Sequence, residues 1–529
     1  MSQLKNGEWK SPFWGKPLSL SGGRDPLGMQ APSIASYAIL VPGLTNLTRR
    51  IRYYGFYCWI NQYYAHHIRN NSKKEYIKFI RRSELLYAYT IVTGDDNAQG
   101  IVGSDYVRKT LKESSDIEIA KGADRDSGKK TYWKYSYGAF GQYYLGSLVD
   151  LGLLKKDNES IGLYLCTEWG NKLAESFDKQ IPSEAKEYFF NAVSSGTTSA
   201  QALTPIANHF HVSNIKPSSD EWSFYINMLS TIDSPNVPEN RWTNFRKETI
   251  SIFLNYLSKS AEDVSDPWFE IPFHLYDDVL SKKTTLESSP TVFGWFFFAL
   301  NEFSHYAMTT ILWGVLETIR RSPMGLNIRL LTNELSNEAT GVLAKLHPDL
   351  NIKSNTLADL YSKIDTIQVN EFSFVDKITE SIKDGLIPDA IAHSISFLVF
   401  LFKKHHSMKD TIKAQSSTMG FLRDGDFNEV FDTIERLQNK PLETFITEII
   451  SRRVINRHLV VAMRKISSGE KTTLKFMLQE QNLIHIQTVF PQWTNPRLQS
   501  LYLYLSDLGV ISNNQLTETG KMLQEACTT

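Results

Sequence analysis

The fold is decided by a pattern that occurs twice along the chain: YLGSLVDLGLL at 144–154, continuing to LCTEWGNKL at 165–173, and YLYLSDLGVI at 502–511, continuing to LTETGKML at 516–523. Each copy begins as an amphipathic helix and ends at Asp-Leu-Gly, where Gly152 or Gly509 suits the left-handed residue that closes a helix. A polar turn then separates two short strands, and Thr167 or Thr517 is placed to cap a final helix. Both copies therefore predict a helix, a hairpin and a second helix.

This order resembles the C-terminal half of winged-helix domains. In that family the helix before the hairpin often reads the major groove of DNA, and the hairpin, called the wing, touches the DNA backbone. The resemblance covers part of residues 80–180 and part of residues 445–529. It implies a fold more than a function, because many winged helices only dock proteins or dimerise. DNA contact and protein docking therefore both remain open.

The first copy has the basic surroundings that DNA contact needs. Its hairpin offers Lys155 and Lys156, the face of its first helix offers Lys134, and the insert before that helix offers Lys129 and Lys130. Lysine side chains at such positions bind the phosphates of a nucleic acid. The second hairpin is short and uncharged, which favours a packing role for the second copy.

A basic and aromatic run lies near the N-terminus, at Arg49-Arg50-Ile51-Arg52-Tyr53-Tyr54. Proteins that bind single-stranded nucleic acids place arginines beside stacking aromatic rings. However, most of the aromatic residues from this run onward recur on one face of a helix, as the side chains of a protein core do. We therefore expect the rings to be buried and Arg49 and Arg52 to be available for phosphate.

Helical periodicity dominates the chain, and strand-like alternation is scarce. The expected fold class is mainly α, a multi-domain helical protein with two winged-helix-like segments that carry small β-hairpins. The expected domains are a helical, winged-helix-like domain at 1–180, a helical middle domain at 181–444 and a winged-helix-like domain at 445–529. The first domain is expected to open with an extended arm over residues 1–33, because prolines and paired glycines there disfavour a continuous helix.

Charge is distributed unevenly, although the net charge of the chain is zero. Residues 1–180 hold 25 Lys and Arg against 18 Asp and Glu, residues 181–444 hold 23 against 33, and residues 445–529 hold 9 against 6. Both ends are therefore basic and suited to phosphate, whereas the acidic middle is not. Ordinary scatter between domains explains the same distribution equally well.

Several functional classes lack support in the sequence. The three cysteines form no CxxC pair, the paired histidines have no ligand at helical spacing, and Gly122–Thr131 departs from a P-loop in its spacing. The apolar run Phe293–Ile319 contains Glu302 and His305, so we expect a buried helix and not a membrane span. The expectation is a cytoplasmic protein with no metal, no cofactor, no catalytic residue and no membrane partner.

One enzymatic alternative remains. Arg453 and His458 fit the loose Arg-x4-His pattern of HEPN-type ribonucleases, in which the arginine stabilises phosphate and the histidine transfers a proton. Val454 departs from the polar residue that is usual after the arginine. The pattern is also short enough to occur by chance in a long chain.

Two N-terminal stretches, 25–30 and 41–54, resemble uncharacterised bacterial proteins found in mobile or phage-defence gene clusters. This resemblance implies a bacterial, multi-component antiphage system, and it transfers no catalytic residue. The sequence therefore favours a non-enzymatic DNA-binding or adaptor subunit. Its expected partners are double-stranded DNA and other protein subunits of a defence-type complex. A HEPN-like ribonuclease effector and a purely structural assembly scaffold are the alternatives.

Overall fold

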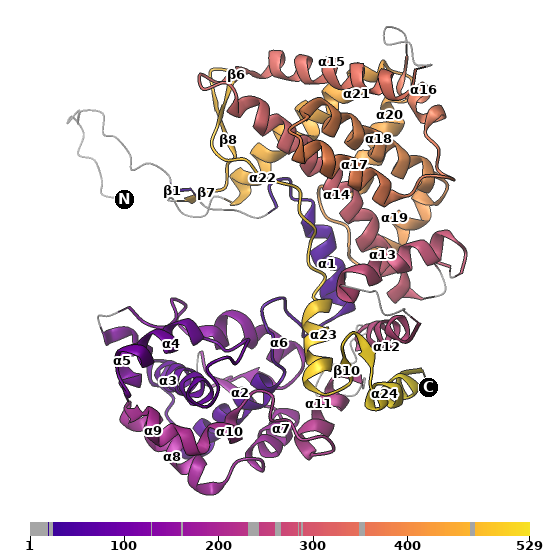
Figure 1. Ribbon diagram of the computed structural model, residues 1–529. Coiled ribbons are helices and arrows are strands. Elements are labelled where there is room, and N and C mark those ends of the chain that lie inside the picture. Colours follow the sequence, from indigo (N-terminus) through magenta and orange to yellow (C-terminus); the bar gives the residue numbers. More distant parts are fainter. Residues whose placement is uncertain are drawn as a thin grey trace, which may run out of the picture. The chain divides into compact units, whose positions relative to one another are not determined.

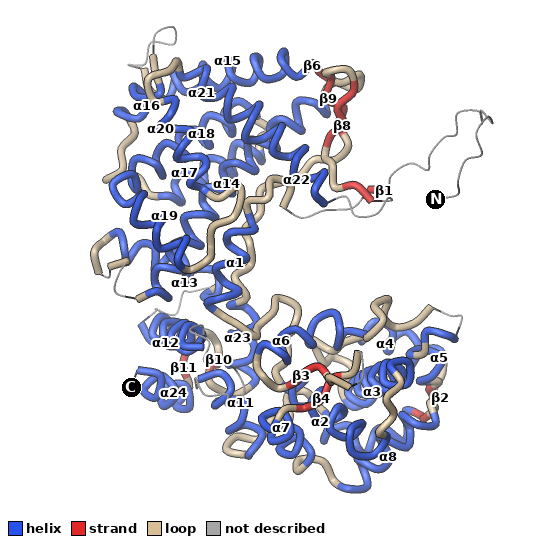
Figure 2. The backbone as a smooth tube through the Cα atoms, turned by 180° about the vertical axis from the view of Figure 1, so that it is seen from behind, coloured by secondary structure: helices blue, strands red, loops and turns tan. Residues whose placement is uncertain are grey.

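The computed structural model describes residues 19–20, 25–127, 130–159, 162–230, 243–259, 266–283, 285–286, 289–348, 355–465 and 471–528 (Figure 1). Helices dominate it, and the strands form only small sheets (Figure 2), which confirms the mainly helical fold class. The chain forms two compact units: a first unit of 1–36 and 297–494, and a second unit of 37–296 and 495–529. Helices α1 (Gln30–Leu40) and α14 (Pro290–Arg320) contribute residues to both units. The division at residues 180 and 444 stays a prediction about separately folding domains.

The second unit contains both copies of the repeated pattern. Its helices and helical turns are α2 (Arg52–Tyr63), η1 (Tyr64–Ile68), α3 (Lys73–Gly94), α4 (Ser104–Glu113), α5 (Ile119–Ala123), η2 (Arg125–Ser127), η3 (Phe140–Tyr144), α6 (Leu145–Asp150), α7 (Glu168–Asp178), α8 (Ser183–Ser195), α9 (Ala200–Leu203), η4 (Thr204–Ile206), α10 (Ala207–Phe210), α11 (Asp220–Ser230), α12 (Thr243–Lys259), α13 (Pro267–Leu280), α23 (Leu498–Asp507) and α24 (Glu518–Thr528). Its strands form three antiparallel pairs, β2 (Asp116–Ile117) with β5 (Thr198–Ser199), β3 (Leu154–Lys156) with β4 (Tyr164–Cys166), and β10 (Ile511–Ser512) with β11 (Gln515–Leu516).

Both copies form the predicted helix, hairpin and helix, as α6-β3-β4-α7 and as α23-β10-β11-α24. The two closing glycines are left-handed as expected, with φ of +69° at Gly152 and +68° at Gly509. Only glycine adopts this conformation without a steric cost from Cβ, and it lets the chain turn from the helix into the first strand. We call 144–173 the first hairpin segment and 502–523 the second hairpin segment.

A threonine closes each hairpin segment in the same way. The hydroxyl of Thr167 lies 2.6 Å from the carbonyl oxygen of the closing glycine and accepts the N–H three residues further on at 3.0 Å. Thr517 makes the same two contacts at 2.6 Å and 3.1 Å. One side chain therefore caps the final helix and ties it to the end of the first helix, which confirms the predicted capping role.

The core of the second unit surrounds α2. Tyr53, Tyr54, Phe56 and Tyr57 are fully buried, which confirms that the aromatic run builds a core. The Tyr54 hydroxyl lies 3.2 Å from the hydroxyl of Ser147 in the first hairpin segment and 3.2 Å from that of Tyr504 in the second. A single side chain of α2 thus contacts both hairpin segments.

The buried carboxylate of Glu84 on α3 fixes the start of the helix before the first hairpin. It accepts the hydroxyl protons of Tyr57 at 2.6 Å and Tyr132 at 2.5 Å. It also accepts the backbone N–H groups of Ala139 and Phe140, both at 2.8 Å. These two N–H groups open the η3-α6 helix and have no partner within it, so the carboxylate caps it from another element. Burial raises the pKa of Glu84 above its usual value.

The first unit is built on the long helix α14. Its other elements are β1 (Ser19–Leu20), β6 (Leu326–Asn327), α15 (Ile328–Leu346), α16 (Leu357–Lys363), α17 (Glu371–Lys383), α18 (Ile387–His405), η5 (His406–Met408), α19 (Lys409–Thr418), α20 (Phe427–Leu437), α21 (Leu442–Glu448), η6 (Ile449–Asn456), α22 (Arg457–Lys465), β7 (Lys471–Thr472), β8 (Phe476–Gln479) and β9 (Asn482–His485). Strands β8 and β9 pair antiparallel, β6 extends this sheet beside β9, and β1 pairs with β7 in parallel. Glu302 and His305 are buried in α14, as expected for a core helix.

The expected extended arm over residues 1–33 is wrong at its end. Helix α1 begins at Gln30 and includes Pro32. Proline is tolerated there because the first N–H groups of a helix have no partner inside the helix. Residues 1–18 and 21–24 lie outside the described part of the chain.

His458 joins three parts of the first unit. Its ring is fully buried, with Nδ1 3.0 Å from the carbonyl oxygen of Pro26. Its Nε2 accepts the backbone N–H of Lys475 at 2.9 Å. A ring nitrogen that accepts an N–H carries no proton, so the imidazole is neutral with its proton on Nδ1. Burial lowers the pKa of His458 to about 4.

The Glu84 cap yields a stability prediction. Glu84→Gln replaces one acceptor oxygen by an NH2 group that faces hydroxyl and N–H donors. We expect a loss of about 2 to 3 kcal/mol in the free energy of unfolding, because buried donors lose their acceptor. Denaturant unfolding measures this, with Glu187→Gln at an exposed position of α8 as the control. Equal stability of the two variants would contradict the capping role of Glu84.

The neutral state of His458 predicts acid sensitivity. A folded-state pKa of about 4 lies below the unfolded value of about 6.5, so the unfolded chain takes up a proton first as the pH falls. The stability that His458 contributes is complete above pH 6.5, and about 3 kcal/mol of it is lost between pH 6.5 and pH 4. His458→Gln should lose less stability over this range than the wild type, in unfolding measured at several pH values. An NMR titration of His458 near pH 6.5 would contradict the assignment.

Candidate functional site

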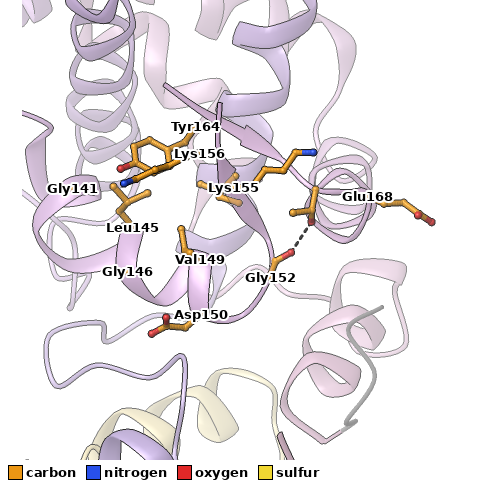
Figure 3. A pocket seen from close by; sticks show the side chains of 12 residues that line it. Gly141, Leu145, Gly146, Val149, Asp150, Gly152, Lys155, Lys156, Tyr164 and Glu168 are labelled. Atoms are coloured by element: carbon orange, nitrogen blue, oxygen red, sulfur yellow. Dashed lines mark hydrogen bonds between the residues drawn. The ribbon is translucent and has the colours of Figure 1, made fainter. Parts of the chain in front are cut away.

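A groove of about 790 Å³ runs between the η3-α6 helix and the hairpin of the first hairpin segment (Figure 3). The helix supplies one wall, strands β3 and β4 supply the other, and Gly152, Thr167 and Glu168 close one end. The lining residues are Gly141, Leu145, Gly146, Val149, Asp150, Gly152, Leu154, Lys155, Lys156, Tyr164, Thr167 and Glu168. The groove therefore lies where a winged-helix protein is expected to act.

The helix wall of the groove is mostly apolar. Leu145 is half-buried, and Val149 is 42% exposed. Gly146 is exposed, and a Cβ atom built on it would meet no atom within 4 Å. The amide oxygen of Gln142 on this helix accepts the indole N–H of Trp133 at 2.8 Å. This wall presents few of the donors and acceptors that read base edges.

The hairpin wall carries positive charge. Lys155 and Lys156 are exposed on β3, opposite Leu165 and Tyr164 of β4. Their side chains leave the strand toward different sides of the hairpin (Figure 3). Among the described residues, no carboxylate forms an ion pair with either lysine. The hairpin therefore has two exposed lysines that form no ion pair with a described residue.

Two acidic residues limit the positive charge of the groove. Asp150 lines it at the end of α6, and burial raises the pKa of this carboxyl. Glu168 begins α7 and forms an ion pair with Lys172 at 3.0 Å. The groove thus has basic side chains on the hairpin and acidic side chains at the helix ends, with no ion pair between the two groups among the described residues.

The other predicted cations do not line this groove. Lys130 and Lys134 are exposed in the segment that precedes η3, and Arg49 is exposed in the loop before α2. Lys129 lies outside the described residues. Of the predicted nucleic-acid contacts that the structure describes, only Lys155 and Lys156 line the groove.

The expected phosphate contact at Arg52 does not fit the structure. Its guanidinium is fully buried and forms an ion pair with Glu221 at 3.1 Å. It also donates to the carbonyl oxygens of His209 and His211 at 3.0 and 2.6 Å. These partners lie far away in sequence, so the local basic pattern around Arg52 did not reveal them.

The second hairpin segment is committed to packing. Leu501, Tyr504 and Leu505 of α23 are fully buried, and Asp507 at its end binds Arg50 at 3.2 Å. The guanidinium of Arg497 lies 4.7 Å from the ring centre of Tyr37. These contacts support the packing role expected from its uncharged turn.

The structure does not bring Arg453 and His458 together at an accessible surface. His458 is fully buried, and both ring nitrogens contact the backbone. Arg453 forms an ion pair with Glu429 and donates to Thr433 at 3.0 Å. Proton transfer to RNA requires an accessible imidazole, and the fully buried ring of His458 does not meet this requirement.

Sequence reasoning missed a second basic pocket in the second unit. It has a volume of about 860 Å³ and lies beside the first turns of α3, where Lys73, Lys74 and Lys78 line it. The signal was present in the sequence as lysines directly after a capping serine, Ser72. Cations are disfavoured there because the helix dipole is positive at its N-terminus.

The described part of the chain shows neither a metal site nor a membrane-spanning helix. No group of three or more His, Cys, Asp and Glu side chains there is arranged to hold a metal ion. None of the described helices combines the length and apolar character needed to cross a membrane.

Comparisons with protein-family models, with curated proteins and with solved structures find no match to this chain, so its function has to be argued from the geometry described above.

Proposed function

We propose that the chain is a non-enzymatic adaptor that contacts duplex DNA through the hairpin of the first hairpin segment. The observation that carries this proposal is the pair of exposed lysines, Lys155 and Lys156, without a carboxylate partner among the described residues. An unpaired lysine on a protruding hairpin gains most from a phosphate, because binding releases counterions from the DNA. The winged-helix resemblance of the segment supports the same placement.

The contact is expected to be independent of base sequence. Specific reading of the major groove needs side chains with paired donors and acceptors on the helix that enters it. The exposed wall of η3-α6 offers Leu145, Gly146 and Val149 instead. Lysines on the hairpin and an apolar helix wall therefore favour contacts with the DNA backbone.

The groove supports a second role, the docking of a protein subunit. Gly146 lies within α6, where glycine costs up to about 1 kcal/mol relative to alanine. A Cβ atom there would meet nothing, so the packing of this chain does not require the glycine. The close approach of a partner backbone to the apolar wall would require it. This reading agrees with the multi-component system implied by the N-terminal resemblance.

DNA binding by the hairpin predicts a change in salt dependence. Replacing both Lys155 and Lys156 by alanine should weaken binding to any duplex and reduce the slope of log affinity against log salt by about 2, since each lost phosphate contact removes about 0.9. Fluorescence anisotropy with two unrelated duplexes measures both effects. Lys282→Ala with Lys283→Ala, an adjacent exposed pair after α13, is the control. Equal slopes for the two double variants would exclude the hairpin as the DNA contact.

Protein docking predicts opposite effects on stability and on assembly. Gly146→Ala should raise the free energy of unfolding by about 0.5 to 1 kcal/mol, as should Gly341→Ala within α15, where a Cβ is equally free of contacts. Gly146→Tyr should abolish recovery of partner subunits with the protein from its host, whereas Gly341→Tyr should not. Recovery of the same partners with both tyrosine variants would remove the groove as a docking site.

A further inference from the structure

The pocket at the start of α3 is lined by more basic than acidic side chains. Helix α3 supplies Lys73, Lys74, Lys78 and Arg81, and the turn η2 supplies Arg125. The acidic lining residues are Glu75, Asp124 and Asp126. Neither Lys155 nor Lys156 lines this pocket, so it is a site separate from the groove.

Two of the three acidic residues are already bound by basic side chains. Asp124 receives two hydrogen bonds from the guanidinium of Arg82, at 2.9 and 2.7 Å. Asp126 forms an ion pair with Lys74 at 2.7 Å, which connects the turn to the helix. That pair is exposed to solvent on both sides, so an anion of higher charge is able to replace Asp126. The Lys74 ammonium lowers the pKa of Asp126.

Arg81 adds a buried and oriented charge to the pocket. Its side chain is fully buried and donates to the carbonyl oxygens of Ala123, Tyr135 and Trp133 at 2.6, 2.7 and 3.0 Å. No carboxylate among the described residues forms an ion pair with it. The three carbonyls fix the guanidinium without neutralising its charge, which favours an anion in the pocket.

The first turn of α3 is an unfavourable place for Lys73 and Lys74, and Lys78 follows in the second turn. The dipole of α3, a helix of 22 residues, is positive at this end and repels cations there. Lys73 and Lys78 form no ion pair with any described residue, and the ammonium of Lys73 lies 5.8 Å from the ring centre of Tyr137. The helix dipole and the lysines together create a field that a phosphate group would stabilise.

We propose that this pocket binds a chain of phosphate groups, such as inorganic polyphosphate or the triphosphate of a nucleotide. A phosphate chain carries several negative charges within the span of the pocket, which matches basic side chains that lie on both the helix and the turn. The phosphate chain would replace the Asp126 carboxylate as the partner of the Lys74 ammonium. The proposal does not depend on DNA binding by the hairpin.

Two substitutions with opposite expected effects test the pocket. Lys78→Ala should weaken the binding of sodium tripolyphosphate about two- to fivefold, the usual effect of one charge contact that is partly screened by solvent. Asp126→Asn should tighten it by a similar factor, because the competing carboxylate is lost. Isothermal titration calorimetry at low ionic strength measures both affinities. Lys112→Ala on α4, an exposed lysine outside the pocket, is the control and should bind like the wild type.

A titration with ATP distinguishes inorganic polyphosphate from a nucleotide triphosphate as the ligand. ATP binding as tightly as tripolyphosphate would show that the phosphates alone are recognised, and tighter ATP binding would show that the nucleoside also contributes. Either result supports phosphate binding in the pocket if Lys78→Ala lowers the affinity for the ligand and Asp126→Asn raises it. The proposal is overturned if tripolyphosphate does not bind, or if both variants bind it like the control. Asp126 and Lys112 are exposed and Lys78 is half-buried, and matching thermal unfolding curves confirm that the variants are folded.

Discussion

The Glu84 carboxylate is the contact on which the rest of the second unit depends. It joins the core helix α2 through Tyr57, the preceding segment through Tyr132, and the start of η3-α6 through two backbone N–H groups. Without this acceptor the η3-α6 helix would begin in the protein interior with unpaired donors. Both the groove and the hairpin take their positions from that helix. Glu84 on α3 is buried and does not line the groove, but it helps to position the helix that does.

The parts of the fold that the sequence predicted are those held by local contacts. Gly152, Thr167 and their counterparts Gly509 and Thr517 lie within about twenty residues of all the partners that define a hairpin segment, so their spacing was informative. The amphipathic helices were recognised for the same reason, since one face shows in any window of a few turns. The boundary at Gln30 was missed because Pro32 is neutral at the start of a helix and unfavourable elsewhere.

Spacing along the sequence did not predict which basic side chains are exposed, because exposure depends on contacts between distant residues. Lys155 and Lys156 are exposed on a short hairpin. Arg52 belongs to the same kind of basic pattern, yet its partner Glu221 is 169 residues away and holds it in the core. The contact of His458 with Pro26 spans 432 residues and was equally invisible in the local sequence. The local sequence therefore shows the residue types of these side chains but not the distant residues that surround them.

The two hairpin segments share one local structure and differ in the surface around it. They share the closing glycine, the threonine cap and the hairpin, and all of these features only stabilise the segment. What differs is the surface around this frame. The second segment buries Tyr504 and commits Asp507 to Arg50, whereas the first leaves Gly146, Lys155 and Lys156 open along a groove. Side chains without partners inside the chain are therefore a better guide to function here than the repeated motif, because the motif explains only its own stability.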